Sequence, residues 1–313
     1  MSGGYETNSI EEPPVKSVVL LGKTFTSLAS LPEEIKSHSM AITNNNELLV
    51  AGGSTFASKG SKICYVYKRN SWFLLSKLND FRLYSSMITM PNGVYIFGGT
   101  KHPSPKEVTP ENASLRTSEF LPNSSGEWQS GPKIPLHGLH GASGVAISND
   151  EILLSGGRDF SNRILVFKIS TNSWYTTNLI YGRWTHASIV YKDNVIICGG
   201  WSETHKTVFG STEILSLLDG CKKIGGNLNV RRRGHGMGLI NFEGTTKLVA
   251  FGGQNDKDGP LSSIEEWNET TQKWEMSNLT LPGPKRWAFT FCSSPNKCLR
   301  NSVTSQWQNL IPL

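Results

Sequence analysis

The feature that most constrains this chain is a short phrase, a run of apolar residues ending in two glycines, that recurs five times. It reads LLVAGG, VYIFGG, ILLSGG, VIICGG and LVAFGG, and its last residues are Gly53, Gly99, Gly157, Gly200 and Gly253. The interval is roughly 50 residues, a period typical of repeat architectures in which each repeat is one supersecondary unit. The phrase therefore predicts an array of five similar units.

The third repeat indicates what one unit contains. Residues 141–147, 151–157, 163–169 and 174–180 are four runs of β-branched and apolar residues, separated by the turn-forming stretches SND, RDFSN and STNS. This pattern predicts a four-stranded antiparallel meander. A tryptophan stands near the start of the expected fourth strand in four repeats, where a large ring can fill the wedge between neighbouring sheets: Trp72, Trp128, Trp174 and Trp274.

Together these residues resemble the kelch repeat, whose pattern is an apolar strand, Gly-Gly, a variable loop, a further strand, a polar turn and a tryptophan. The resemblance covers roughly residues 36 to 290. It implies an all-β fold, a β-propeller with one blade per repeat. The alternative is an unrelated β-sandwich in which the glycine pairs occur by chance.

The two ends of the chain predict one more blade. Residues 17–32 have the pattern of a third and a fourth strand, and residues 286–291 that of a first strand. Joining them would remove the exposed sheet edges of an open ring, and kelch propellers are known to close in this way. We therefore expect a six-bladed kelch-type β-propeller with its last blade closed by N- and C-terminal strands, as a single domain over 16–313 that follows a flexible segment, 1–15.

Composition argues against several function classes. The net charge is +6, but no run of basic residues exceeds Arg231 to Arg233, so we expect no nucleic-acid partner. No stretch approaches the ~18 apolar residues that a membrane-spanning helix needs, and the N-terminus lacks a signal pattern. Cys64 and Cys198 lie in apolar runs, which suits buried free thiols and a cytoplasmic location, although Cys292 and Cys298 could form a disulfide in a secreted protein.

One face of such a propeller is expected to carry recognition. In a four-stranded antiparallel blade, the loop after Gly-Gly and the connection into the next blade lie on the same face. An arginine precedes the first strand in four repeats. Some kelch adaptors grip acidic peptides with arginines at this position and with residues just after Gly-Gly, which here are Ser54, Thr100, Arg158, Trp201 and Gln254. The predicted partner-binding residues are Arg82, Tyr84, Arg158, Arg183, Trp184, Trp201, Arg233, Arg286 and Trp287.

The same arginines have a structural alternative, in which each bonds backbone carbonyls between blades. The histidines that open first strands, His38, His140, His186 and His235, could in principle ring the axis. Metal ligands must converge to about 2.0–2.1 Å from one ion, and residues on different blades are too far apart for that, so we expect no metal.

The sequence thus predicts a non-enzymatic protein-interaction module, an adaptor or scaffold that binds an acidic peptide or protein without a cofactor. Any link to a ubiquitin ligase or to the cytoskeleton would come through other subunits. The second candidate is a carbohydrate-binding or mutarotase-like enzyme, because the resemblance extends to propellers with such activity. No nucleophile elbow, phosphate loop or zinc-binding helix motif supports an enzyme.

Overall fold

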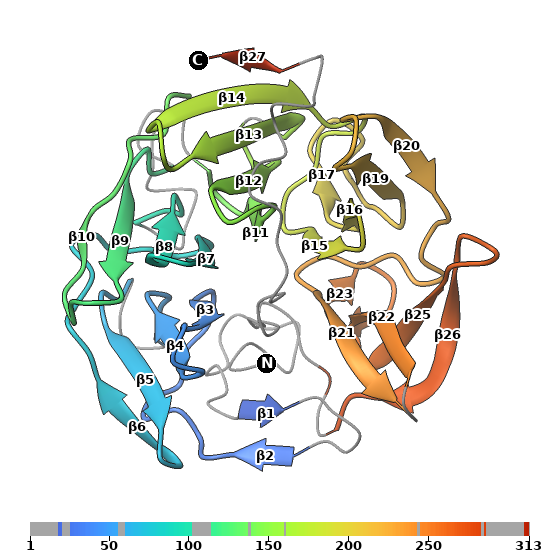
Figure 1. The fold of residues 1–313 in the computed structure, drawn as a ribbon. Coiled ribbons are helices and arrows are strands. Elements are labelled where there is room, and N and C mark those ends of the chain that lie inside the picture. The colour runs from blue at the N-terminus through green and yellow to red at the C-terminus, as the bar shows by residue number, and fades with distance from the viewer. Residues whose placement is uncertain are drawn as a thin grey trace.

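The chain folds as an all-β propeller, in which antiparallel sheets surround a central axis (Figure 1). The computed structural model describes residues 18–20, 26–55, 60–101, 114–136, 139–159, 161–242, 245–282, 285 and 310–312. Every regular element in these residues is a strand. Accordingly, this part of the chain contains no helix that could cross a membrane.

Five sheets follow the five repeats in order, and each begins with the strand nearest the axis. Blade 1 consists of β3 (Ser39–Ile42), β4 (Leu48–Ala51), β5 (Cys64–Lys68) and β6 (Ser71–Leu74). Blade 2 consists of β7 (Ser86–Met90), β8 (Gly93–Phe97), β9 (Ser118–Pro122) and β10 (Gln129–Ser130). Blade 3 consists of β11 (Ser143–Ala146), β12 (Glu151–Ser155), β13 (Arg163–Lys168) and β14 (Ser173–Asn178).

The last two blades carry an extra hairpin after Gly-Gly. Blade 4 consists of β15 (Ala187–Tyr191), β16 (Asn194–Cys198), β19 (Thr212–Ser216) and β20 (Lys222–Gly225). Its extra hairpin consists of β17 (Trp201–Ser202) and β18 (Thr207–Val208). Blade 5 consists of β21 (Gly236–Phe242), β22 (Thr245–Phe251), β25 (Ser263–Asn268) and β26 (Lys273–Thr280). Its extra hairpin consists of β23 (Gln254–Asn255) and β24 (Gly259–Pro260). The predicted four-stranded meander is thus confirmed in every repeat.

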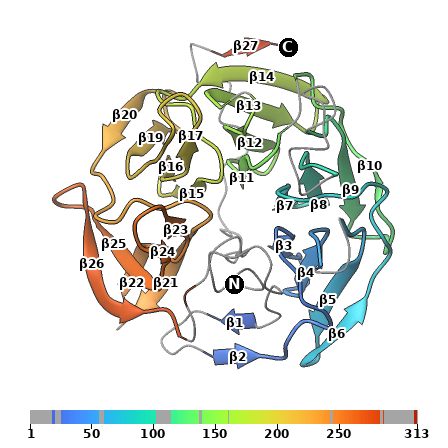
Figure 2. The ribbon, with the colours of Figure 1, turned by 180° about the vertical axis from the view of Figure 1, so that it is seen from behind.

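The described residues contain five four-stranded blades, not the six that we predicted. A two-stranded sheet, β1 (Val18–Leu20) with β2 (Thr26–Leu28), lies between blades 5 and 1 in both views (Figures 1 and 2). The last strand, β27 (Ile311–Pro312), pairs with β14 at the outer edge of blade 3 and does not join β1 and β2. The predicted first strand at 286–291 and the predicted flexible segment at 1–15 lie outside the described residues.

The hydrophobic core of this fold lies between neighbouring blades. Leu49 and Cys64 of blade 1 pack with Ile96 and Trp128 of blade 2, and similar clusters join blades 2 and 3, 3 and 4, and 4 and 5. The tryptophans serve these contacts as the sequence predicted; for example, Trp174 of blade 3 meets Phe97 of blade 2 edge to face, with ring centroids 6.0 Å apart. Stability therefore depends on each blade having a neighbour.

The Gly-Gly pairs mark the closest approach between one blade and the connection into the next. A Cβ on Gly52 would lie 2.3 Å from the backbone oxygen of Arg82, and one on Gly156 would lie 2.2 Å from that of Arg183. Both glycines also have positive φ, 72° and 62°, which residues with a Cβ rarely adopt. The motif is required because the backbones of adjacent blades touch here.

A ring of hydrogen bonds runs from blade to blade around the axis. Tyr84 N donates to Ser37 O, Gly141 N to Tyr84 O, Thr185 N to Gly141 O and Gly234 N to Thr185 O, at 2.8–2.9 Å. All five residues are left-handed, with φ between 50° and 69°. The ring fixes where each first strand begins, and hence which residues precede it at the surface.

Candidate functional site

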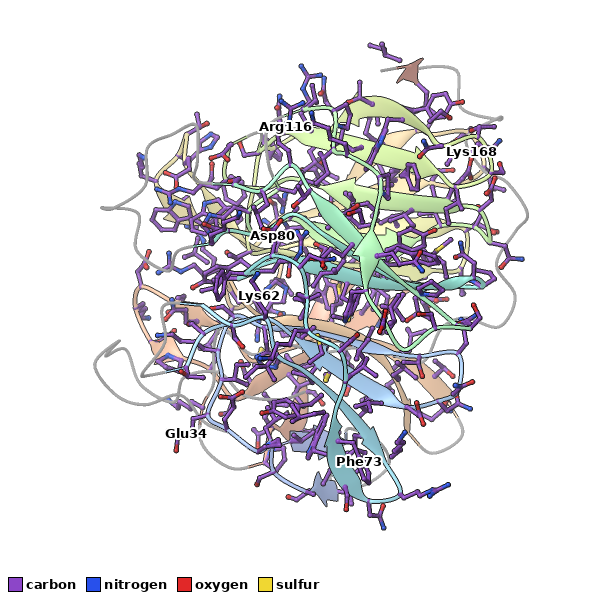
Figure 3. All side chains as sticks on the ribbon, turned by 90° about the vertical axis from the view of Figure 1, so that its left-hand side faces the viewer. Glu34, Lys62, Phe73, Asp80, Arg116 and Lys168 are labelled. Atoms are coloured by element: carbon purple, nitrogen blue, oxygen red, sulfur yellow. The ribbon has the colours of Figure 1, made fainter. Side chains whose placement is uncertain are left out.

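The predicted common face of two sets of loops is present in the structure. In the side view, Glu34 and Asp80, from connections into first strands, lie toward the same side as Lys62 and Arg116, from loops that precede third strands (Figure 3). Lys168, at the turn between a third and a fourth strand, lies on the opposite side (Figure 3). We call the first side the loop face.

The innermost residues of the loop face form a repeated pair in each blade. The residue that precedes the left-handed position is bonded through the backbone to the residue that follows Gly-Gly. We call these five pairs the rim: Lys36 with Ser54, Leu83 with Thr100, His140 with Arg158, Trp184 with Trp201, and Arg233 with Gln254. In the Trp184–Trp201 pair each N–H donates to the other residue's oxygen, at 2.8 and 3.0 Å. The backbone therefore holds both side chains of a pair at the axis.

The rim is chemically uneven. In blades 1 and 2 three of its four side chains, Ser54, Leu83 and Thr100, are buried at 2% exposure or less. In blades 3 to 5 it carries aromatic rings and cations, where Arg158 lies 5.9 Å from the Trp184 ring and Arg233 lies 4.9 Å from the Trp201 ring. Such stacked guanidinium and indole groups are common at protein-binding hot spots.

The aromatic series extends from blade 4 toward blade 2. The His140 ring lies 5.6 Å from that of Trp184 and 5.1 Å from that of Tyr84. Neither nitrogen of His140 nor Nε1 of Trp184 has a hydrogen-bond partner among the described residues. Burial and, to a smaller extent, the nearby charge of Arg158 lower the pKa of His140 to about 4, so the imidazole is neutral at pH 7.

The two rim arginines differ in their partners. Arg233 forms an ion pair with Asp256 at 3.5 Å. The Arg233 guanidinium also donates to the side-chain oxygen of Gln254 at 3.2 Å, when the Gln254 amide is oriented with its oxygen toward the arginine. Arg158 forms no ion pair within the described part of the chain; its guanidinium lies over the Trp184 ring, and its charge acts on the Glu203 carboxylate. Arg158 is therefore the rim arginine whose guanidinium is not held in an ion pair and can meet an anionic group of a partner.

The structure buries two of the predicted partner contacts. Arg82 and Arg183 are 0% exposed, because each is enclosed between the strands of its blade. Arg82 Nε lies 2.9 Å from Glu119 Oε1, and Arg183 Nη2 lies 2.7 Å from Glu213 Oε1. Their Nη1 atoms donate to backbone oxygens, those of Gly98 and Gly199, which is close to the structural alternative that the sequence left open. Neither arginine reaches a partner at the surface.

In the third instance of the motif, Arg233 is not the structural equivalent of Arg82 and Arg183 that we predicted. Arg232 is the buried counterpart of Arg82 and Arg183, and its Nη2 lies 2.7 Å from Glu265 Oε1. Arg233 is one residue further on, at the rim position of Trp184, so it stays a predicted partner contact together with Tyr84, Arg158, Trp184 and Trp201. Arg286 and Trp287 lie outside the described residues.

The three glutamates that hold these arginines were not among the predicted site residues. Each follows a Ser or Thr by two residues at the start of a third strand: Glu119, Glu213 and Glu265. Each also accepts hydrogen bonds from backbone N–H groups of the connection that carries its arginine; Glu213, for example, accepts from Ile180 N and Tyr181 N at 2.6 and 2.9 Å. The repeated Ser/Thr-x-Glu pattern in the blades that also have the arginine was the available signal.

The histidines do not form a catalytic or metal-binding ring. His38, His186 and His235 follow the left-handed position directly, whereas His140 lies one residue earlier, at the rim. Burial lowers the pKa of His38 and His186 to about 3 and that of His235 well below 6.5, so they are poor proton acceptors near neutral pH. The described residues contain no group of three or more His, Cys, Asp or Glu side chains placed to share a metal ion.

Comparisons with known proteins agree with this architecture. No family model matches the chain. Kelch-like protein 38 of Rattus norvegicus is 29% identical over 211 residues, 64% of this chain and 34% of that protein. Kelch-like protein 38 of Homo sapiens is 27% identical over 191 residues, 56% of this chain and 30% of that protein. The chain thus spans about a third of the length of these curated relatives.

A solved structure matches most of the chain. The structure of YjhT superposes with a TM-score of 0.69 at 14% identity, over 88% of this chain and 96% of that one, which shows the shared fold. The fold and the recurring Gly-Gly blades define a β-propeller of the repeat class. Its similarity to the Kelch-like proteins supports a kelch-repeat β-propeller.

Proposed function

We propose that this chain is a non-catalytic protein-interaction module that binds an acidic peptide or protein on the loop face, over the rim of blades 3 to 5. The observation that carries the proposal is the Arg158 guanidinium, which stacks on Trp184 and forms no ion pair with a carboxylate in the described residues. Arg binds carboxylates in a bidentate manner, and its hydrogen bonds to charged groups contribute about 1.5–3 kcal/mol.

Three further facts support this proposal. Trp201 and Arg233 extend the aromatic and cationic surface next to Arg158. The net charge of +6 favours encounter with an acidic partner. The low pKa values of His140 and His186 make these two imidazoles poor general bases near pH 7, which favours binding over catalysis.

The experiment is selection of peptides from a displayed random library by the immobilised protein, followed by affinity measurement with the enriched peptides. Arg158→Ala and Trp201→Ala should each weaken binding by about 1–3 kcal/mol. Lys168→Ala, which removes a cation on the opposite face, is the matched control. Enriched peptides without acidic residues would contradict the acidic specificity, and equal binding by all variants would contradict the location.

We also propose that β1 and β2 are the outer half of a sixth blade, completed by residues after Lys285. Trp72 of blade 1 supports this, because its Nε1 donates to Ala29 O, next to β2. The tryptophans of blades 2, 3 and 5 likewise contact the blade that precedes their own. Hydrogen exchange tests it. Backbone amides of residues 286–291 should be protected like those of β21, and fast exchange there would contradict closure.

The cytoplasm is the proposed location. Cys64 and Cys198 are buried free thiols, as predicted, which suits a reducing compartment. Fractionation of cells that express the protein, with the thiols trapped by alkylation, tests this. Recovery in the secreted fraction would contradict it.

A further inference from the structure

Three soft metal-ligand side chains meet between blades 4 and 5, away from the rim. Cys198 ends β16, His235 precedes β21, and Met237 is the second residue of β21. Cys198 Sγ lies 3.5 Å from His235 Nε2 and 3.5 Å from Met237 Sδ. We propose that these three side chains form a binding site for a single monovalent soft metal ion, Cu(I).

Two of the three ligand separations can be compared with those around one shared ion. Sulfur and nitrogen ligands bond first-row metals at about 2.3 and 2.0–2.1 Å, so two ligands at near-tetrahedral angles lie roughly 3.5–3.8 Å apart. The two separations that involve Cys198 Sγ, 3.5 Å each, are at the short end of this range. Cys198 is therefore spaced from both His235 and Met237 as the ligands of one ion are.

The donor types select the metal. A thiolate and a thioether are soft ligands that favour Cu(I), and imidazole also suits copper, whereas Ca²⁺ and Mg²⁺ prefer oxygen. Cys198 and Met237 are 0% exposed and His235 is 4% exposed. Such a dry site protects bound Cu(I) from water.

The charge around the site favours a monovalent ion. The guanidinium groups of Arg183 and Arg232 and the imidazole of His186 act on His235, and Glu265, the acidic group that acts on Cys198, is already paired with Arg232. Cu(I) binding replaces the thiol proton of Cys198, which leaves to solvent, so the net charge of the site does not change. Zn²⁺ in its place would leave one uncompensated positive charge next to two guanidinium groups.

His235 can bind the ion through Nε2 if its proton lies on Nδ1. Nδ1 has no hydrogen-bond partner in the described part of the chain, so this change of tautomer breaks no bond there. The step is therefore Cys-SH plus Cu(I) giving Cys-S-Cu plus one proton, with no change of oxidation state.

The preceding pair of blades provides an internal contrast. There Ser155 Oγ lies 2.8 Å from His186 Nε2, in the same relation as Cys198 to His235, and Ser188 takes the place of Met237. The backbone arrangement of the Ser155–His186 pair is the same, but serines stand there in place of both sulfur donors. The fold thus accommodates a serine at the equivalent position of the preceding blade.

The test is anaerobic titration with Cu(I) against a chromophoric Cu(I) chelator, in a Cys221→Ser/Cys292→Ser/Cys298→Ser background. We expect one Cu(I) per chain, one proton released, sulfur ligands in the X-ray absorption spectrum, and a higher melting temperature. Cys198→Ser should abolish binding, and Met237→Leu, which conserves volume, should weaken it by about tenfold or more.

The matched control is Cys64→Ser, which removes the other buried thiol and should leave Cu(I) binding unchanged. Unchanged binding in Cys198→Ser, or Zn²⁺ binding as tight as Cu(I) binding, would overturn the proposal. If Cys198→Ser fails to fold, Met237→Leu and the absorption spectrum decide. Peptide binding at the rim is measured separately, so failure of either proposal leaves the other intact.

Discussion

Arg232 and Arg233 are neighbours in the chain but belong to two different regions of the molecule. Arg232 is 0% exposed and holds Glu265 inside blade 5, whereas the Arg233 side chain is 28% exposed and stacks on Trp201 at the rim. The difference follows from backbone position relative to the left-handed residue Gly234. A single step along the chain separates a residue that supports the blade from one that a partner can contact.

Blade 3 shows that the buried region accepts another solution. Leu139 occupies the place of the buried arginines, since its oxygen accepts from Gly99 N as that of Arg82 accepts from Gly53 N. Leu165 occupies the place of the glutamates, and both leucines belong to one apolar cluster. An ion pair or an apolar pair can therefore fill this position, but a single unpaired charge cannot.

Acid should have the largest effect on stability, and this effect arises from buried histidines. The folded pKa values of His38 and His186 are about 3 and that of His140 is about 4, below the unfolded value of about 6.5. The unfolded chain then binds more protons between pH 6.5 and about 3, so stability falls as pH falls, by about 1.4 kcal/mol per unit for each such histidine. Urea unfolding at pH 7, 6 and 5 measures this.

The control for the acid experiment is His205→Gln, which changes an exposed histidine near the rim and should retain the full pH dependence. A variant His186→Gln should lose part of it. Stability that is constant from pH 7 to 5 would show that the buried histidines are not neutral in the folded protein.

Removal of one partner of a buried ion pair should have the next largest effect. Glu213→Ala leaves the Arg183 guanidinium uncompensated in a fully buried position. We expect a loss of about 3–5 kcal/mol in the free energy of unfolding, measured by urea denaturation. Glu203→Ala, at a partly exposed loop-face residue, is the control, and a comparable loss in both would remove the distinction between the regions.

Replacement of both partners should cost much less. The variant Arg183→Leu/Glu213→Leu imitates the pair Leu139 and Leu165 of blade 3. It leaves no buried charge, and the two residues whose N–H groups lose the carboxylate, Ile180 and Tyr181, are both exposed to solvent. We expect it to be more stable than Glu213→Ala by about 2 kcal/mol or more. A double variant that is less stable than the single one would show a need for the ion pair itself.

The rim should give the smallest effect on stability. Arg158→Ala and Arg233→Ala each remove a partly exposed side chain that stacks on an indole ring. Melting temperatures should correspond to a change of about 1 kcal/mol or less in the free energy of unfolding. A larger loss of stability in either variant would show that the arginine supports the fold, as the buried arginines do.

The repeats, the strand order within each blade and the positions of the tryptophans were predictable, because Gly-Gly and the strand periodicity are local signals. The roles of Arg82 and Arg183 were not, since exposure depends on whether an acidic residue far along the chain, such as Glu119, faces the arginine. The position of β27 on blade 3 was also not predictable, because no local pattern in Ile311 and Pro312 specifies which edge they join.

The backbone pairing at the rim has a consequence for how this protein could acquire a different partner. The position after Gly-Gly holds Ser54, Thr100, Arg158, Trp201 and Gln254 in the five blades, and the same backbone bond forms each time. Because N–H and C=O groups make this bond, it does not depend on which side chain is present. The recognition surface can therefore change one residue at a time across generations while the ring beneath it keeps its shape.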